Sequence, residues 1–190
     1  MNDKNNNKPW QDYPEIWKTK SLYFTWLRGN LRKIWNTSPQ KTQFIKNNRK
    51  QIPNSNKNAK KKSVWGGECD ICKNDFPINQ LQVDHIISAG QLNDWADIES
   101  FVMRLLGSHE GELRFLCKTC HAVCTYAEKH NLTFNQAWIK KECIDFIKRF
   151  TIEQQKRKLK SIGARDCDIS NEKKRKAFYE KHLLNNGDRL

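Results

Sequence analysis

The sequence predicts an α+β fold in which a small core of two strands and a helix lies between basic helical segments. Three observations lead to this prediction. Polar and apolar residues alternate at residues 80–84, which is typical of a strand. Apolar side chains recur at helical spacing on both sides of that segment. Cysteines occur as two Cys-x-x-Cys pairs, and with 37% hydrophobic residues among 190 the chain can bury only a modest core.

The two cysteine pairs predict a structural metal site. They are Cys69 with Cys72, and Cys117 with Cys120. Four thiolates in two such pairs are the usual donor set of a structural Zn2+. A redox dithiol is the alternative, and the thin core and the second pair favour zinc. The three remaining cysteines are expected to be buried small side chains or free thiols: Cys124, Cys143 and Cys167.

Charge is spread unevenly along the chain. Residues 1–62 hold 15 Lys and Arg against 3 Asp and Glu, residues 63–138 hold 5 against 10, and residues 139–190 hold 15 against 8. Basic arms that also carry aromatic residues favour a polyanion partner, most simply nucleic acid. A basic surface that serves solubility alone is the alternative.

No membrane partner is expected. No run approaches the 18 apolar residues of a membrane span, and the N-terminal residues lack the apolar stretch of a signal peptide. We therefore expect a cytoplasmic protein.

We divide the chain into three predicted domains. Residues 1–63 form a basic, aromatic-rich helical arm and linker, residues 64–132 form the core, and residues 133–190 form a basic helical extension. Within the arm we expect disorder over residues 1–12, a helix from about Glu15 to Asn36, and a linker over residues 47–63. Its tryptophans are expected to pack against other residues: Trp10, Trp17, Trp26 and Trp35. The candidate DNA-binding residues are Arg28, Arg32, Lys33, Lys60, Lys61 and Lys62.

The core elements follow in order. "GECDICKN" predicts a tight turn that directs two thiolates at one metal, and "INQLQVDHI" predicts a strand. A helix is expected over residues 93–106, with Asn93 as its cap and Gly107 at its end. "GELRFLC" predicts a second strand and "KTCHAVCTYAEKHN" a helix ending near Asn131.

Asp84-His85 followed by Cys117-x-x-Cys120-His121, and framed by Cys69-x-x-Cys72, resembles the HNH endonuclease family. The resemblance covers about residues 66–130 and is to the zinc-stapled, phage-type branch with its ββα-metal fold. It implies a metal-dependent endonuclease that nicks or cuts double-stranded DNA. His85 would be the general base, and Asp84 with His121 would hold a catalytic Mg2+ or Mn2+. A phage-encoded chain would act in the bacterial cytosol, as a homodimer or with a packaging or replication partner.

The sequence departs from the family pattern at one catalytic position. Glu112 stands where the family's middle Asn is expected. A Glu could bind metal there, or hold His85 as an imidazolium by raising its pKa. Three alternatives stay open from the residues: Asp84 only orients His85, His121 joins a Cys3His zinc site, or the chain is a zinc-containing DNA-binding module or regulator with an inactive HNH site.

The strand itself sets a condition on the site. Adjacent residues on a regular strand point to opposite faces, and one way for Asp84 and His85 to serve one site is for the strand to end there and twist into the loop. The connection between His85 and Cys117 is long, and the expected helix at residues 93–106 is an insertion in it.

Overall fold

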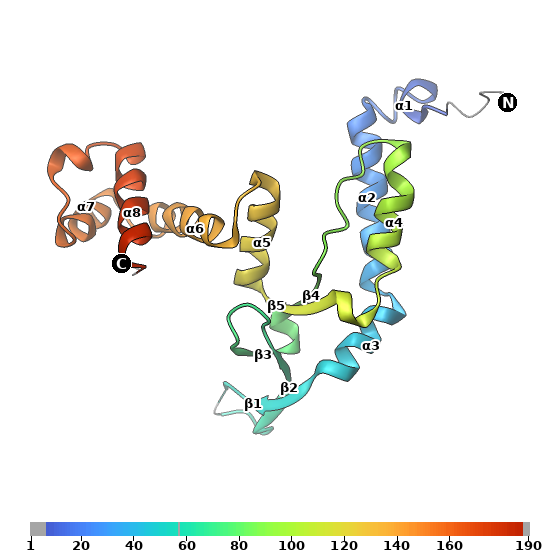
Figure 1. The fold of residues 1–190 in the computed structure, drawn as a ribbon, viewed down its shortest axis with the longest axis horizontal. Coiled ribbons are helices and arrows are strands. Elements are labelled where there is room, and N and C mark those ends of the chain that lie inside the picture. The colour runs from blue at the N-terminus through green and yellow to red at the C-terminus, as the bar shows by residue number, and fades with distance from the viewer. Residues whose placement is uncertain (1–6, 57, 188–190) are drawn as a thin grey trace. The chain divides into compact units, whose positions relative to one another are not determined.

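The computed structural model describes residues 7–56 and 58–187 (Figure 1). The chain is a mixed α+β protein with small antiparallel sheets. By its internal contacts it divides into two units, unit 1 (Met1–Lys118) and unit 2 (Thr119–Leu190), and each is described by itself. The functional division into arm, core and extension stays a prediction.

The N-terminal part of unit 1 is helical. It contains α1 (Pro9–Asp12), α2 (Lys20–Asn36) and α3 (Pro39–Asn48). The expected start of α2 at Glu15 is wrong, because Thr19 caps the helix by accepting a hydrogen bond from the backbone N–H of Leu22 at 3.2 Å. The expected disorder up to residue 12 is also wrong where the structure describes the chain, since α1 forms there; residues 1–6 lie outside the described residues.

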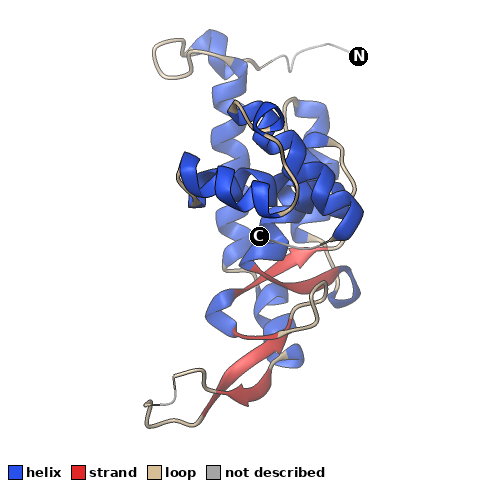
Figure 2. Cartoon of the chain, turned by 90° about the vertical axis from the view of Figure 1, so that its left-hand side faces the viewer, coloured by secondary structure: helices blue, strands red, loops and turns tan. Residues whose placement is uncertain are grey.

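A three-stranded antiparallel sheet follows, in the order β1-β2-β3. Its strands are β1 (Lys50–Pro53), β2 (Ser63–Glu68) and β3 (Asp75–Pro77). The linker expected over residues 47–63 is therefore wrong in part, because that segment contains the end of α3, strand β1 and the loop of the β1–β2 hairpin (Figure 2).

The two predicted core strands are confirmed. They form the antiparallel hairpin of β4 (Leu81–His85) and β5 (Leu113–Cys117), whose register pairs Leu81 with Cys117 and His85 with Leu113. The segment between them holds α4 (Ile98–Leu106), which ends at Gly107 as expected. The capping residue differs, because Asp94 rather than Asn93 caps a 3-10 turn (Trp95–Asp97) that precedes α4.

The core of unit 1 joins the arm to the β4–β5 hairpin. Helices α2 and α4 lie side by side (Figure 1). The rings of Phe44 and Phe115 are 5.0 Å apart between centroids, so α3 packs directly on β5. The largest buried apolar side chains of this core are Phe24, Trp35, Phe44, Leu92, Phe101, Leu105, Leu113 and Phe115. The arm is thus part of the structure that holds the hairpin.

Unit 2 is helical, as predicted for the C-terminal segment. Its helices are α5 (Lys118–His130), which starts at the last residue of unit 1, α6 (Phe134–Arg149), α7 (Ile152–Ser161) and α8 (Glu172–Asn186). Capping boxes begin α6 and α7, with Thr133 and Thr151 as the cap residues.

A buried polar pair ties three helices of unit 2 together. The side chains of Arg175 on α8 and Gln155 on α7 are 5% and 3% exposed. Arg175 Nε donates to Gln155 Oε1 at 2.7 Å, and Gln155 Nε2 donates to the carbonyls of Ile147 and Phe150 at the end of α6. Burial of these groups is tolerated because each is hydrogen-bonded.

Among the described residues, no helix combines the length and apolar character that crossing a membrane requires.

Candidate functional site

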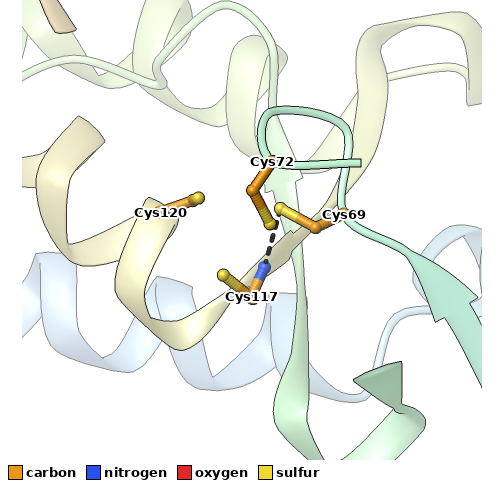
Figure 3. Close-up of side chains that lie close together, drawn as sticks. All are labelled: Cys69, Cys72, Cys117 and Cys120. Atoms are coloured by element: carbon orange, nitrogen blue, oxygen red, sulfur yellow. Dashed lines mark hydrogen bonds between the residues drawn. The ribbon is translucent and has the colours of Figure 1, made fainter. Parts of the chain in front are cut away.

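The four predicted zinc ligands come together in the structure. The Sγ atoms of Cys69, Cys72, Cys117 and Cys120 all lie within 4.8 Å of one another. Figure 3 shows their side chains converging from three places: the turn between β2 and β3, the end of β5, and the first turn of α5.

The backbone of the β2–β3 turn is shaped for this cluster. Cys69 N–H donates to the carbonyl of Asn74 at 2.9 Å, and Lys73 N–H donates to the carbonyl of Cys69 at 2.9 Å. Lys73 takes the left-handed conformation, with φ of 57°, which turns the chain back after the second cysteine. The exposed side chain of Lys73 also forms an ion pair of 2.9 Å with Asp70.

Hydrogen bonding favours the thiolate form of Cys69. Its Sγ accepts a hydrogen bond from the backbone N–H of Cys117 at 3.3 Å (Figure 3). Burial raises the pKa of the Cys69 thiol, but the N–H groups of Cys117 and of residues 71–72 outweigh it and lower the pKa to about 7. The thiol at the centre of the cluster is therefore readily ionised, as a metal ligand must be.

These residues fit a structural zinc ion. Tetrahedral zinc with Zn–S bonds of about 2.3 Å needs sulfur atoms about 3.8 Å apart, which is compatible with four Sγ atoms that all lie within 4.8 Å of one another. Three of the four cysteines are buried and only Cys72 is exposed. Four soft thiolates favour zinc over Mg2+ or Ca2+, which prefer oxygen ligands.

Asp84 lies on β4 in an ion pair. Its carboxylate accepts hydrogen bonds from Nε and Nη2 of Arg114, its direct partner on β5, each at 3.0 Å. The two side chains are 19% and 22% exposed. Arg114 was not among the residues singled out from the sequence, because the register that pairs it with Asp84 spans the whole insertion between the strands.

His85 lies at the end of β4 and contacts different residues. Its Nε2 is 3.1 Å from the carbonyl oxygen of Leu105, and its ring centroid is 4.4 Å from that of Trp35. A carbonyl can only accept, so Nε2 carries the hydrogen and Nδ1 carries the lone pair. The strand ends at His85, yet His85 still pairs with Leu113, so Asp84 and His85 point to opposite faces.

The surroundings of His85 favour its neutral form. Burial lowers the pKa of His85 below its ordinary value of 6.5. The Leu105 carbonyl and the carboxylates of Asp84 and Glu112 act in the opposite direction without reversing the shift. The pKa is thus lowered, whereas the sequence had left open that Glu112 keeps His85 protonated.

Glu112 closes a local turn. Its carboxylate accepts a hydrogen bond from the backbone N–H of His109 at 3.2 Å and lies 3.5 Å from Nε2 of the same histidine. The backbone carbonyl of Glu112 accepts from the N–H of Ile86 at 2.8 Å, which extends the β4–β5 pairing by one bond.

The remaining predicted ligand, His121, follows Cys120 in the first turn of α5 and is half-buried. Within residues 7–56 and 58–187, the cysteines form the one group of three or more metal-binding side chains that lie close together. The structure therefore brings together the four predicted zinc ligands, and among the described residues it does not gather Asp84, Glu112 and His121 into a second such group.

The predicted DNA-binding residues lie on two elements of unit 1. Arg28, Arg32 and Lys33 are on α2, where Arg28 is half-buried and the other two are exposed. Lys60, Lys61 and Lys62 are all exposed in the loop of the β1–β2 hairpin.

The three cysteines outside the cluster differ in burial. Cys143 is buried, and burial raises the pKa of its thiol to about 12. Cys124 is half-buried and Cys167 is exposed.

Comparison with known proteins gives no relative: no family model, no curated protein and no solved structure matches this chain.

Proposed function

We propose that this protein is a metal-dependent endonuclease of the HNH type, which hydrolyses phosphodiester bonds of double-stranded DNA. The observation that carries the proposal is the state of His85. It stands at the end of a strand, beside Asp84, with Nε2–H donating to the Leu105 carbonyl and Nδ1 as its basic atom. A neutral imidazole held in one tautomer is what general-base catalysis requires.

In the proposed reaction, His85 Nδ1 removes a proton from a water molecule as its oxygen attacks phosphorus. The bond from phosphorus to the 3′ oxygen breaks, that oxygen takes up a proton from solvent water, and His85 later releases its proton to solvent. The products are a 5′-phosphate and a 3′-hydroxyl. The Leu105 carbonyl keeps the imidazole oriented and stabilises the imidazolium that forms, because it accepts from Nε2 in both states.

The cysteine cluster supports this proposal because it lies beside the β4–β5 hairpin that carries His85. Cys117 ends β5 and Cys69 follows β2, so zinc bound to both would fix the strand that pairs with His85. A small metal site can replace a large core in holding such elements.

The resemblance assigns a catalytic divalent cation, Mg2+ or Mn2+, to Asp84 and His121. When bound, such a cation supplies Lewis-acid stabilisation of charge on the phosphate. The contacts of Asp84 do not fit this role as they stand, since Arg114 holds its carboxylate. We therefore derive no step from the cation.

That same ion pair favours a second candidate function, a zinc-containing DNA-binding module or regulator that does not cut. A carboxylate occupied by Arg114 needs no metal to balance its charge. In this case the basic residues of α2 and of the β1–β2 loop would bind phosphates, and His85 would serve only in packing.

Incubation of supercoiled plasmid with the purified full chain in Mg2+, Mn2+ or EDTA separates the two candidates. His85→Gln is compared with His130→Gln, which changes an exposed histidine on α5. The nuclease proposal requires nicked or linear plasmid with a divalent ion, none with EDTA, and loss of cleavage in His85→Gln alone. Retarded plasmid in a gel shift without cleavage under any metal condition supports the binding module instead.

A further inference from the structure

The β1–β2 hairpin presents an exposed tryptophan under a guanidinium. Trp65 on β2 is 47% exposed, which is high for a large aromatic side chain. The guanidinium carbon of Arg49, at the C-terminal end of α3, lies 4.2 Å from the centre of its ring. This is a close cation–π contact that fixes the indole plane and keeps a positive charge beside it.

The two faces of the hairpin differ. Gln51 pairs directly with Trp65, so both side chains lie on one face, where both are exposed. The next pair, Ile52 with Val64, lies on the other face, where Ile52 is only 5% exposed. The hairpin is therefore packed on one face, and the other presents a stacking surface beside an amide that can donate and accept hydrogen bonds.

Charge gathers on the same hairpin. Residues 49–67 hold six Lys and Arg and no Asp or Glu. The longer segment of residues 16–67 holds thirteen Lys and Arg and also no Asp or Glu. Lys50 is engaged with Asp75 at 2.7 Å. Lys60, Lys61 and Lys62 are exposed in the loop that joins the strands, at the lower end of unit 1 in Figure 2.

We infer that the β1–β2 hairpin binds unpaired nucleotides of DNA, with a base stacked on Trp65 and the backbone phosphates held by Arg49 and the lysines of the loop. An aromatic ring interleaved with cations is the combination that binds single strands, because every base has a π face and every linkage a negative charge. This inference rests on the proposed function, which gives DNA as the substrate. It adds that the protein prefers DNA with a single-stranded, nicked or frayed segment.

A binding measurement tests this inference apart from cleavage. Fluorescence anisotropy of labelled DNA would compare a single strand with a blunt duplex of the same sequence, in EDTA-free buffer without Mg2+ or Mn2+. The variants are Trp65→Ala, Trp65→Phe and, as the matched control, Trp26→Ala, which removes a tryptophan of similar exposure from α2. Thermal melting and zinc content of each variant confirm that it is folded.

Trp65→Ala is expected to weaken binding of the single strand about ten-fold, with a much smaller effect on the blunt duplex. Trp65→Phe should recover most of the affinity, and Trp26→Ala should stay within about two-fold of wild type. An unchanged single-strand affinity in Trp65→Ala overturns the inference, as does an equal loss on both DNAs. Binding of anionic lipid vesicles in place of DNA also overturns it.

Plasmid cleavage by the same variants keeps the two proposals distinguishable. If wild type cuts and Trp65→Ala binds single strands normally, the hairpin inference fails and the nuclease proposal stands. If wild type binds single strands through Trp65 but never cuts, the nuclease proposal fails and the hairpin inference stands.

Discussion

Arg114 donates two hydrogen bonds to a single oxygen of Asp84, Oδ2, from Nε and Nη2 at 3.0 Å each. The two residues face each other across the β4–β5 hairpin. With side chains about one-fifth exposed, the pair is less screened by water than a surface ion pair. The ion pair therefore holds the Asp84 carboxylate in place and supports the register of the hairpin.

The coupling between Asp84 and Arg114 is measurable in a double-mutant cycle. We expect Asp84→Ala and Arg114→Ala each to lower the free energy of unfolding, because each removes two hydrogen bonds from a partly buried charge. The double variant should lose less than the sum, with a coupling of about 1–2 kcal/mol in urea denaturation. Simple additivity of the two changes would contradict the description of this pair.

Zinc should be part of the folded protein. Elemental analysis of the purified chain is expected to give one zinc ion per chain, and Cys69→Ser should lose it. Because binding energy of a structural zinc is folding energy, the melting temperature should fall by about 10 °C or more. Cys167→Ser is the matched control, since Cys167 is exposed and outside the cluster. A melting temperature of Cys69→Ser equal to that control would argue against a metal site.

The stability of the protein should depend on pH through His85. Its pKa is lowered in the folded state by burial, so on acidification the unfolded state takes up the proton first. Stability from this residue is complete above pH 6.5 and falls as the pH drops below that value toward the folded pKa. His85→Gln, which does not titrate, should flatten this part of the curve in urea denaturation at a series of pH values. An identical slope in both proteins would show that His85 is not the group responsible.

The buried pair of Gln155 and Arg175 in unit 2 should contribute more to the free energy of unfolding than a contact on the surface does. Gln155→Ala removes the acceptor of Arg175 Nε and the donor to two carbonyls. We expect a loss of about 2–4 kcal/mol in the free energy of unfolding, since buried groups are left unsatisfied. Arg157→Ala, an exposed change on the same helix, should cost less than about 0.5 kcal/mol. Equal effects of the two changes would mean that the pair is not buried in solution.

Local patterns predicted most of the elements that carry the site. The alternation from Leu81 to Asp84 was enough to place β4, and the two Cys-x-x-Cys pairs were enough to predict the four-cysteine cluster. These signals depend on neighbours in the sequence. Strand β1 was missed because Ile52 is its one large apolar residue, and its pairing with β2 crosses a polar loop.

The contacts that decide the chemistry lie between distant segments. Trp35 reaches His85 from α2, and the Leu105 carbonyl reaches it from the insertion, so neither partner follows from the residues around Asp84-His85. Arg114 is likewise joined to Asp84 only by the strand register. Such pairings require tertiary structure, because no periodicity in one segment specifies the side chain opposite it.

Plasmid cleavage by wild type and His85→Ala, compared at equal DNA occupancy set by gel shift, tests whether His85 is the general base, and His130→Ala is the control. His130 is exposed at the end of α5, where it contacts Tyr126. We expect cleavage by wild type and by His130→Ala, and a cleavage rate at least about a hundred-fold lower in His85→Ala with DNA binding retained. Cleavage by His85→Ala at the wild-type rate would contradict this role of His85.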